Sequence, residues 1–296
     1  MDWLVSHAVA IGSALLAAFV AAVGIVVRQA ALQRPAVDES GATVLRDPLW
    51  WAGTGAAITA YVFQAIALAH GSLLLVQPLL VSSLLFVLPL SARRSGHRVT
   101  GIEWAWALLL TAALSAFVLV GQPREGHYRP PVPAWTIALA WIVPVSVICV
   151  VVARRSTGRV RATSLGVAVA VGLGMVAVLT KVCTHRFAVG SWHALLTDPA
   201  PYVLVTLAVV VTGLQQWAFR AGALQASVPV MLVGEPIVAV VLGINVLGEY
   251  LTVSELGVVV LPVAVVAMVM ATIALGRGEG AQTESAGHSA VARASQ

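Results

Sequence analysis

Charge is scarce in this chain of 296 residues, because only 10% of them are Asp, Glu, Lys or Arg and 59% are hydrophobic. An ordinary soluble domain carries roughly 25% charged residues, and a soluble fold of this size cannot hide so much apolar surface. Lys and Arg (17) outnumber Asp and Glu (12), but the Arg residues lie in short clusters between apolar runs. That pattern indicates membrane topology rather than nucleic-acid binding, so we expect the lipid bilayer as a partner and no nucleic acid.

Cysteines and catalytic motifs are scarce as well. The two cysteines, Cys149 and Cys183, can form neither a disulfide framework nor a four-ligand zinc site. The seven histidines include no His-x-x-x-His pair, and the sequence holds neither a Gly-x-x-x-x-Gly-Lys-Ser/Thr loop nor a Gly-x-Ser-x-Gly elbow. These absences argue against an ATP-driven pump and a metal-dependent membrane enzyme. We expect a protein that is not an enzyme and has no metal site and no cofactor.

Long apolar runs are abundant. A membrane helix needs about 20 mostly apolar residues to cross a hydrocarbon core of about 30 Å. Nine stretches qualify, at residues 5–31, 49–69, 71–91, 102–121, 134–153, 162–182, 200–220, 224–247 and 254–276. The first stretch begins without the basic segment of a secretory signal, so we expect it to be retained. The sequence predicts an all-α integral membrane protein with about nine transmembrane helices.

The basic residues predict an orientation in the membrane. Counted on alternate sides of the nine segments, twelve Arg residues lie on one side and three on the other, with Arg28 and Lys181 at helix ends. Cytoplasmic loops carry the excess of Lys and Arg, so we expect the N-terminus outside and the C-terminus in the cytoplasm of a bacterial inner membrane. We expect Lys181 and Arg220 to reach for lipid headgroups. The Arg run within residues 154–161 is interpreted as a topology anchor, with anionic-lipid contact as its functional alternative.

The chain aligns with itself at an offset of 152 residues, or 151 after a one-residue slip. The matched pairs include Thr54 with Thr206, Gln64 with Gln216, Glu103 with Glu255, and Pro78 with Pro229. Chance similarity between apolar helices is the alternative. Five crossings separate the two starts, so the copies enter from opposite faces, which is the inverted repeat of many secondary transporters. We predict a 4+1+4 arrangement: a first repeat (1–133), a connector (134–161), a second repeat (162–276) and a disordered tail (277–296).

One acidic residue, Glu235, falls midway along an apolar segment, roughly 14 Å deep. A carboxylate at that depth costs about 2.5 to 3.5 kcal/mol and therefore indicates function by default. Gly234 precedes it and Pro236 follows it, so we expect the helix to open or bend there. Desolvation favours the neutral carboxyl, which predicts proton exchange near neutral pH. The structural alternative is a carboxyl that merely bonds a neighbouring helix or an arginine.

Neutral polar residues complete the candidate site. The repeat places Ser83 opposite Glu235, with Ser82 beside it and Gln77 one to two turns earlier. These side chains are candidates to donate and accept hydrogen bonds in a central cavity. Gln64 and Gln216 lie toward the ends of the second and seventh helices, where lining the cavity and bonding a neighbouring helix are both open.

Two sets of motifs resemble those of a known superfamily. Residues 228–239 (Val-Pro-Val-Met-Leu-Val-Gly-Glu-Pro-Ile-Val-Ala) and 247–252 (Leu-Gly-Glu-Tyr-Leu-Thr) resemble the closing part of EamA-type domains in the drug/metabolite transporter superfamily. Residues 49–53 (Leu-Trp-Trp-Ala-Gly) and 75–79 (Leu-Val-Gln-Pro-Leu) are similar to motifs of the NIPA-type magnesium transporters within it. The resemblance covers roughly residues 5–276 and implies a membrane transporter. Nine helices suit the NIPA type better than the ten of most EamA proteins.

The NIPA pattern is expected to carry Gly-Glu where this chain has Ala60 and Tyr61. That departure removes an oxygen ligand, and Mg²⁺ usually needs carboxylates. The sequence therefore predicts a secondary transporter of a small organic metabolite, working by alternating access and coupled to protons through Glu235. Two alternatives stay open: a NIPA-like magnesium transporter, and a non-transporting scaffold in which Glu235 locks helices together. The sequence also leaves open whether the chain acts alone or as a homodimer.

Overall fold

The structure is a computed structural model that describes residues 7–32, 48–95, 99–126, 132–189, 197–221, 224–253 and 255–294. Its helices are α2 (Ala8–Leu32), α3 (Pro48–His70), α4 (Leu73–Val81), α5 (Ser83–Ser95), α6 (Gly101–Gly121), α7 (Val132–Arg155), α8 (Gly158–Val189), α10 (Ala200–Arg220), α11 (Leu224–Asn245) and α12 (Glu255–Ala294). Two short strands, β1 (Pro123–Arg124) and β2 (Tyr250–Leu251), complete the described elements.

Nine spans in these ranges are long and apolar enough to cross a membrane, with α4 and α5 together forming one of them. They follow the nine predicted segments closely. A helix satisfies its backbone N–H and C=O groups internally, which is why long apolar segments take this form in lipid. The prediction of an all-α, multi-pass membrane protein is confirmed.

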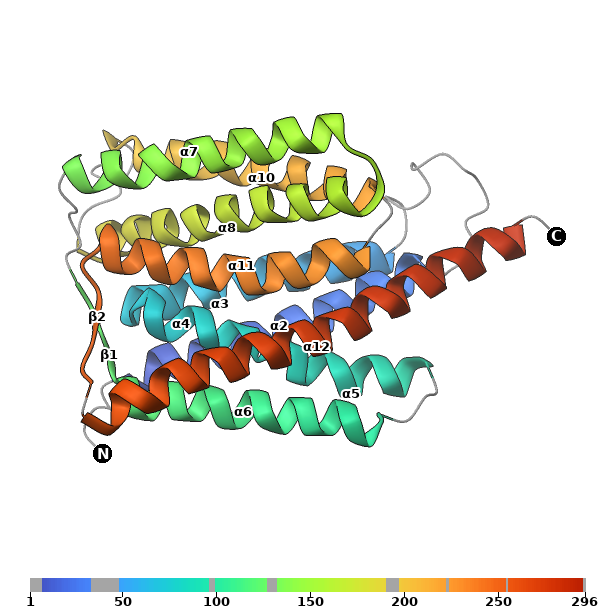
Figure 1. The fold of residues 1–296 in the computed structure, drawn as a ribbon, viewed down its shortest axis with the longest axis horizontal. Coiled ribbons are helices and arrows are strands. Elements are labelled where there is room, and N and C mark those ends of the chain that lie inside the picture. The colour runs from blue at the N-terminus through green and yellow to red at the C-terminus, as the bar shows by residue number, and fades with distance from the viewer. Residues whose placement is uncertain are drawn as a thin grey trace.

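The helices form one bundle, in which α8 lies between α11 on one side and α7 and α10 on the other (Figure 1). The span within α8 is the most deeply buried of the nine in the described ranges. It packs against α11, α10, α7 and α3, while α2 packs against α3, α4 and α5. Contacts between α4 and α11 and between α6 and α12 join the early helices to the late ones. The bundle therefore places α11, which carries Glu235, between α8 and α4.

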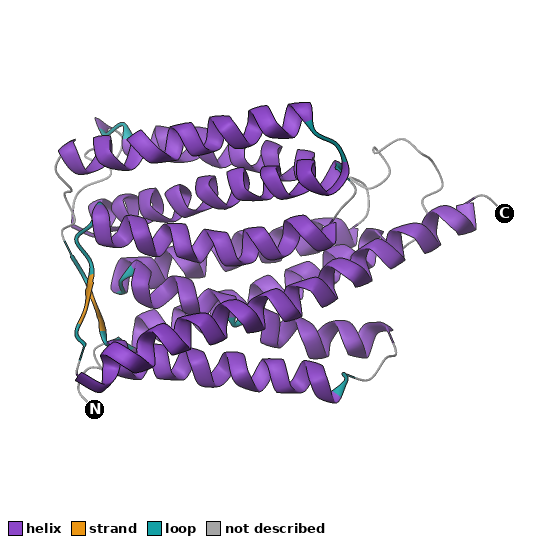
Figure 2. Cartoon of the chain, viewed as in Figure 1, coloured by secondary structure: helices purple, strands orange, loops and turns teal. Residues whose placement is uncertain are grey.

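The two strands pair at one end of the bundle (Figure 2). They are antiparallel, with Pro123 opposite Leu251 and Arg124 opposite Tyr250. The ribbon connects the segment after α6 to the segment between α11 and α12, so it ties two distant parts of the chain together. We refer to this end of the bundle as the ribbon end.

The third predicted helix, at residues 71–91, is interrupted. It divides at Ser82 into α4 and α5. The Ser82 hydroxyl donates to the carbonyl of Leu79 at 2.6 Å, and the Ser82 N–H is directed to the same carbonyl at 3.1 Å. A serine that bonds back to its own helix competes with the regular ladder, and Pro78 has already removed one donor. The break in the bundle thus lies in the predicted first repeat.

The predicted opening at Glu235 is wrong in this structure, because α11 runs as one helix from Leu224 to Asn245. Pro236 removes a single backbone donor, and close packing holds the helix on both sides of it. A side chain at Gly234 would come within 2.7 Å of the Ala170 Cβ on α8, so only glycine permits this approach. Small residues at such crossings let membrane helices pack tightly.

The tail predicted to be disordered from residue 277 also differs. Helix α12 continues to Ala294 and projects beyond the bundle in Figure 1. This stretch contains no proline and five alanines, which favour helix, alongside three glycines, which do not.

Candidate functional site

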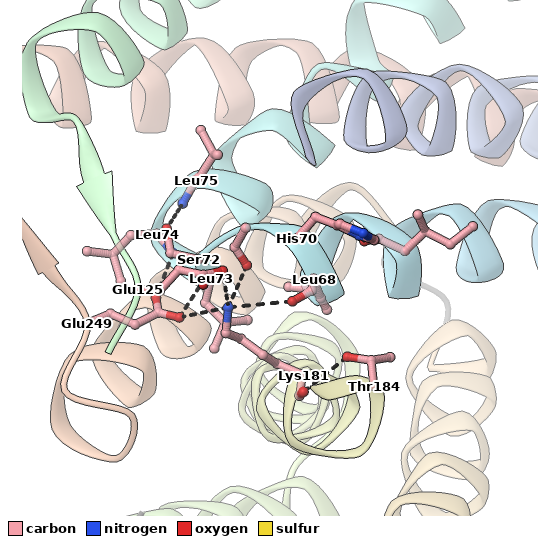
Figure 3. Close-up of polar contacts among 12 residues, drawn as sticks. Leu68, His70, Ser72, Leu73, Leu74, Leu75, Glu125, Lys181, Thr184 and Glu249 are labelled. Atoms are coloured by element: carbon pink, nitrogen blue, oxygen red, sulfur yellow. Dashed lines mark hydrogen bonds and ion pairs between the residues drawn. The ribbon is translucent and has the colours of Figure 1, made fainter. Parts of the chain in front are cut away.

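A buried cluster of charged groups lies at the ribbon end, where α8, the turn between α3 and α4, and the segment after α11 meet (Figure 3). Lys181 of α8 is 2% exposed and Glu249 is 1% exposed. The Lys181 Nζ lies 3.6 Å from the Glu249 Oε1 and 3.3 Å from the Glu125 Oε1. An ion pair that is shielded from water in this way depends on both partners being present.

The Lys181 ammonium also bonds to the end of α3. It donates to the carbonyl of Gly71 at 2.5 Å and to that of Leu68 at 3.5 Å. The last carbonyls of a helix have no partners within it and carry its negative dipole end. Lys181 supplies both a hydrogen-bond donor for these carbonyls and a positive charge for the dipole end, so it anchors the end of α3 to α8.

Glu249 plays the opposite role at the start of α4. Its two carboxylate oxygens accept the N–H groups of Leu73 at 2.9 Å and Leu74 at 3.1 Å, and the Ser72 Oγ accepts that of Leu75. An anion at a helix N-terminus is stabilised by the unpaired donors and by the positive dipole end. A side chain at Gly243 would come within 2.9 Å of the carboxylate, so this glycine makes room for it.

Burial raises the pKa of the Glu249 carboxyl above its ordinary value. The Lys181 ammonium and the N–H groups of Leu73 and Leu74 lower that pKa part of the way back, while the neighbouring Glu125 raises it. Glu249 is therefore a carboxyl whose protonation responds to the presence of Lys181.

The prediction that Lys181 reaches for headgroups is wrong, since the side chain is buried among protein groups. Its partners Glu125 and Glu249 were not predicted from the sequence. The available signal was the single lysine in a long apolar helix, because an ionisable residue there normally faces a partner inside the bundle. The partner itself could not be identified, since Gly71 and Glu249 are far from Lys181 along the chain.

Glu235 lies half-buried on α11. Successive helix residues turn by roughly 100°, so Glu235 sits between the face that packs on α8 through Gly234 and the face that packs on α4 through Gly243. Among the described residues its carboxyl has no hydrogen-bond or ion-pair partner. The residue predicted to be functional is therefore not held by the fold.

Gln77 carries a further unpaired group, one of several in the described residues that include the Ser227 Oγ on α11. It lies on α4, is 2% exposed, and its Nε2 has no partner in the described part of the chain. Helices α4 and α11 are packed together, and Pro78 and Pro236, the next residues after Gln77 and Glu235, line the same hollow. The structure thus brings the predicted Gln77 and Glu235 onto neighbouring helices. Buried polar groups normally have partners, so two such groups without them indicate a site for a ligand.

The other predicted residues are placed differently. Ser82 is buried, and its hydroxyl bonds the carbonyl of Leu79. Ser83 begins α5 and is half-buried, as is Gln64 on α3. Gln216 is exposed on α10, so of the two roles left open for it, lining a central cavity finds no support here. Within the described ranges, no hydrogen bond or ion pair joins Gln64 or Gln216 to Glu235.

A hollow of about 800 Å³, here called the vestibule, opens at the other end of the bundle. Its walls include Arg159 of α8, Gly234 of α11 and Arg277 of α12, and we refer to this end as the arginine end. Arg159 lies about 33 Å along α8 from Lys181, so the vestibule and the charged cluster occupy opposite ends. The lining includes Gly234, which directly precedes Glu235 on α11, but not Glu235 itself.

A smaller hollow of about 180 Å³, here called the groove, lies between α4, α6, α11 and α12. Its lining is apolar and includes Pro78 and Pro236, and Val233 lines both the groove and the vestibule. Ile237 in its wall is 46% exposed, so the groove opens on the outer surface of the bundle, which faces lipid.

Metal ligands are not gathered in the described residues, where no three His, Cys, Asp or Glu side chains lie together. Cys149 and Cys183 are both free.

Comparison with known proteins gives one informative match. The chain is 38% identical over 277 residues to the uncharacterized protein Cgl0250/cg0304 of Corynebacterium glutamicum, and the match covers 92% of this chain and 96% of that protein. No family model matches the chain, and no solved structure matches it.

Proposed function

We propose a transport function for this chain, which belongs to the same family as the uncharacterized Corynebacterium glutamicum protein. The protein is a secondary carrier of an organic solute in the plasma membrane of a bacterium. It works by alternating access, with the solute bound near Glu235 and a proton carried by that carboxyl. Nothing in this scheme calls on catalysis, a cofactor or nucleic acid.

The observation that carries this proposal is the unpaired state of Glu235 and Gln77 on the packed helices α11 and α4. Broken and proline-containing helices commonly form the central sites of carriers, and α4 with its break at Ser82 packs on α11. The vestibule opens at the arginine end, and its lining includes Gly234, the residue before Glu235 on α11. A carboxyl that has no fixed partner is free to bind a solute or a proton in turn.

The charged cluster at the ribbon end acts as the closed gate in this proposal. Lys181 and Glu249 hold the end of α3, the start of α4 and the segment after α11 together, and both side chains are sealed from water. For the carrier to open at this end, these contacts have to break. The described arrangement corresponds to a state open at the arginine end.

Two oppositely inserted four-helix units, α2 to α6 and α8 to α12, with α7 as connector, form part of the same proposal. Their internal contacts are alike: α2 packs on α3 and on α4 and α5, and α8 packs on α10 and on α11. The contacts of α4 with α11 and of α6 with α12 join equivalent helices of the two units. The excess of Arg on one side supports a cytoplasmic arginine end.

Two alternatives fit the site less well. A scaffold in which Glu235 locks helices together requires a partner for the carboxyl, and none lies among the described residues. A magnesium carrier requires several oxygen ligands, but Glu125 and Glu249 face Lys181 and leave Glu235 as the unpaired carboxylate on these packed helices. Binding of an organic solute does not require several carboxylate ligands.

The test is uptake into proteoliposomes under an imposed pH gradient, screened over labelled metabolites and Mg²⁺. We expect the parent protein to accumulate a solute, and Glu235→Gln to lose the dependence on the gradient. The matched control is Glu255→Gln, which removes an exposed carboxyl from the first turn of α12. If Glu235→Gln transports at the parent rate and still depends on pH, the coupling role of Glu235 is refuted. If Glu235→Gln instead fails to assemble in detergent, the scaffold is correct.

A further inference from the structure

The vestibule has the electrostatics of an anion site. Arg159 and Arg277 both line it, and the described lining residues include no Asp or Glu. Its wall also contains Ala226, so the first turns of both α8 and α11 border the vestibule. The N-terminus of a helix carries a partial positive charge and unpaired N–H donors. Two guanidinium groups and two helix starts therefore favour a ligand with more than one negative charge.

The two arginines of the vestibule come from distant parts of the chain. Arg161, two residues after Arg159, lies over the ring of Trp217 at 5.2 Å and is not among the residues that line the vestibule. Arg277 comes from α12, far along the chain, yet it borders the same hollow as Arg159. A planar guanidinium group suits a phosphate because it can donate two parallel hydrogen bonds.

The groove supplies the second half of the site. It meets the vestibule at Val233, and its wall is apolar along the lipid-facing surface, where Val265 is 39% exposed. The apolar groove opens toward lipid, and the cationic vestibule beside it opens at the arginine end. This pair of hollows matches a molecule with a charged head and a hydrocarbon chain. The hydrocarbon chain of such a molecule lies in the apolar groove, while its charged head reaches the arginines.

We propose that the vestibule and the groove together bind a membrane-resident phosphate monoester with a hydrocarbon chain. The phosphate lies between Arg159 and Arg277, and the chain lies in the groove past Val233. This inference rests on the proposed carrier function and names the class of its substrate. A phosphate monoester carries about 1.5 to 2 negative charges at neutral pH, which matches the two arginines.

Binding of dodecyl phosphate to the full chain in phosphatidylcholine nanodiscs tests the proposal, with empty nanodiscs as the blank and calorimetry as the measurement. We expect Arg159→Gln and Arg277→Gln each to weaken binding by roughly tenfold or more, the effect of losing a charge-assisted hydrogen bond. The matched control is Arg155→Gln, an exposed arginine at the end of α7 that does not line the vestibule. It should bind as tightly as the parent.

The groove has its own pair of variants. Val265→Trp fills the groove and should weaken dodecyl phosphate at least as much as either arginine variant. Val263→Trp adds the same bulk at a 63% exposed position outside the groove and should leave binding unchanged.

Three results would overturn the proposal. Parent-like binding by both arginine variants would exclude the headgroup site, and equal binding of inorganic phosphate would exclude the hydrocarbon chain. Loss of dodecyl phosphate binding in phosphatidylglycerol nanodiscs would show that an ordinary bilayer lipid occupies the site. The carrier function fails separately: tight dodecyl phosphate binding without any gradient-driven transport refutes the carrier, whereas gradient-driven transport through Glu235 without that binding refutes only the substrate class.

Discussion

Replacement of Lys181 by methionine removes the ammonium group but keeps an unbranched, mostly apolar side chain. The parent ammonium lies 3.6 Å from Glu249 and 3.3 Å from Glu125, and it is 2% exposed. Removing one partner of a buried ion pair costs about 3 to 5 kcal/mol, because the remaining charge stays buried. We expect Lys181→Met to lower the free energy of unfolding by that amount. Glu249→Gln should cost less, about 1 to 3 kcal/mol, since Lys181 keeps Glu125 and the carbonyl of Gly71.

This defect should depend on pH. Burial raises the pKa of Glu249 in the folded protein, and losing Lys181 removes the main opposing influence. A raised pKa contributes stability at low pH that is lost as the pH rises through the folded-state pKa. Lys181→Met should therefore be least stable at neutral and alkaline pH and should recover as the pH falls toward the ordinary pKa of glutamate, about 4.3.

The assay is unfolding by SDS in mixed micelles, followed through the fluorescence of the nine tryptophans at several pH values. Arg155→Met, which removes an exposed cation, is the control and should change stability by less than about 0.5 kcal/mol. The double variant Lys181→Met/Glu249→Gln should recover part of the loss, because it contains no uncompensated charge at position 249. A parent-like unfolding midpoint for Lys181→Met, or no recovery in the double variant, would refute the reasoning.

Three further predictions concern the helices. Gly234→Ala should destabilise the protein by about 1 to 3 kcal/mol, because the added methyl group overpacks against α8. The control Gly213→Ala adds a methyl group that meets nothing within 4 Å and should not destabilise the protein. Equal effects of the two variants in SDS unfolding would contradict this. Thr100→Ala should cost about 1 kcal/mol and speed amide exchange at the start of α6, because it removes the capping box with Glu103; unchanged exchange there would refute it. Ser82→Ala removes the 2.6 Å hydrogen bond from the Ser82 hydroxyl to the carbonyl of Leu79, so it should slow transport and increase amide protection between α4 and α5. Parent-like transport and amide protection would show that the helix break is not needed for transport.

Hydropathy was sufficient to predict the membrane class and the approximate helix ranges, because apolar length alone decides whether a segment spans a bilayer. It was insufficient to predict the details within helices. The division at Ser82 depends on a local side-chain bond to Leu79, and the continuity of α11 through Pro236 depends on packing against α8. Neither contact leaves a trace in a hydropathy profile.

The candidate site was predicted in part. Glu235 was identified from its cost in an apolar helix and Gln77 from its place near the repeat counterpart of Glu235, and the structure places them on packed helices. Lys181 was misinterpreted because the cost of a buried charge depends on its partner, and Glu249 lies in a different part of the chain. Gln216 was one candidate for the cavity because the repeat pairs it with Gln64, but a repeat fixes a position along a helix and not the face that the residue occupies.

The most direct test of alternating access around Glu235 is labelling of a single cysteine in the vestibule wall, two residues before it, from each side of the membrane. With Cys149 and Cys183 replaced by serine, Val233→Cys places a thiol in the wall of the vestibule. We predict that a membrane-impermeant maleimide labels it from the arginine end in the parent background, and that Lys181→Met adds labelling from the ribbon end. Absence of labelling from the arginine end, or equal labelling from both ends before Lys181 is changed, would contradict the carrier mechanism.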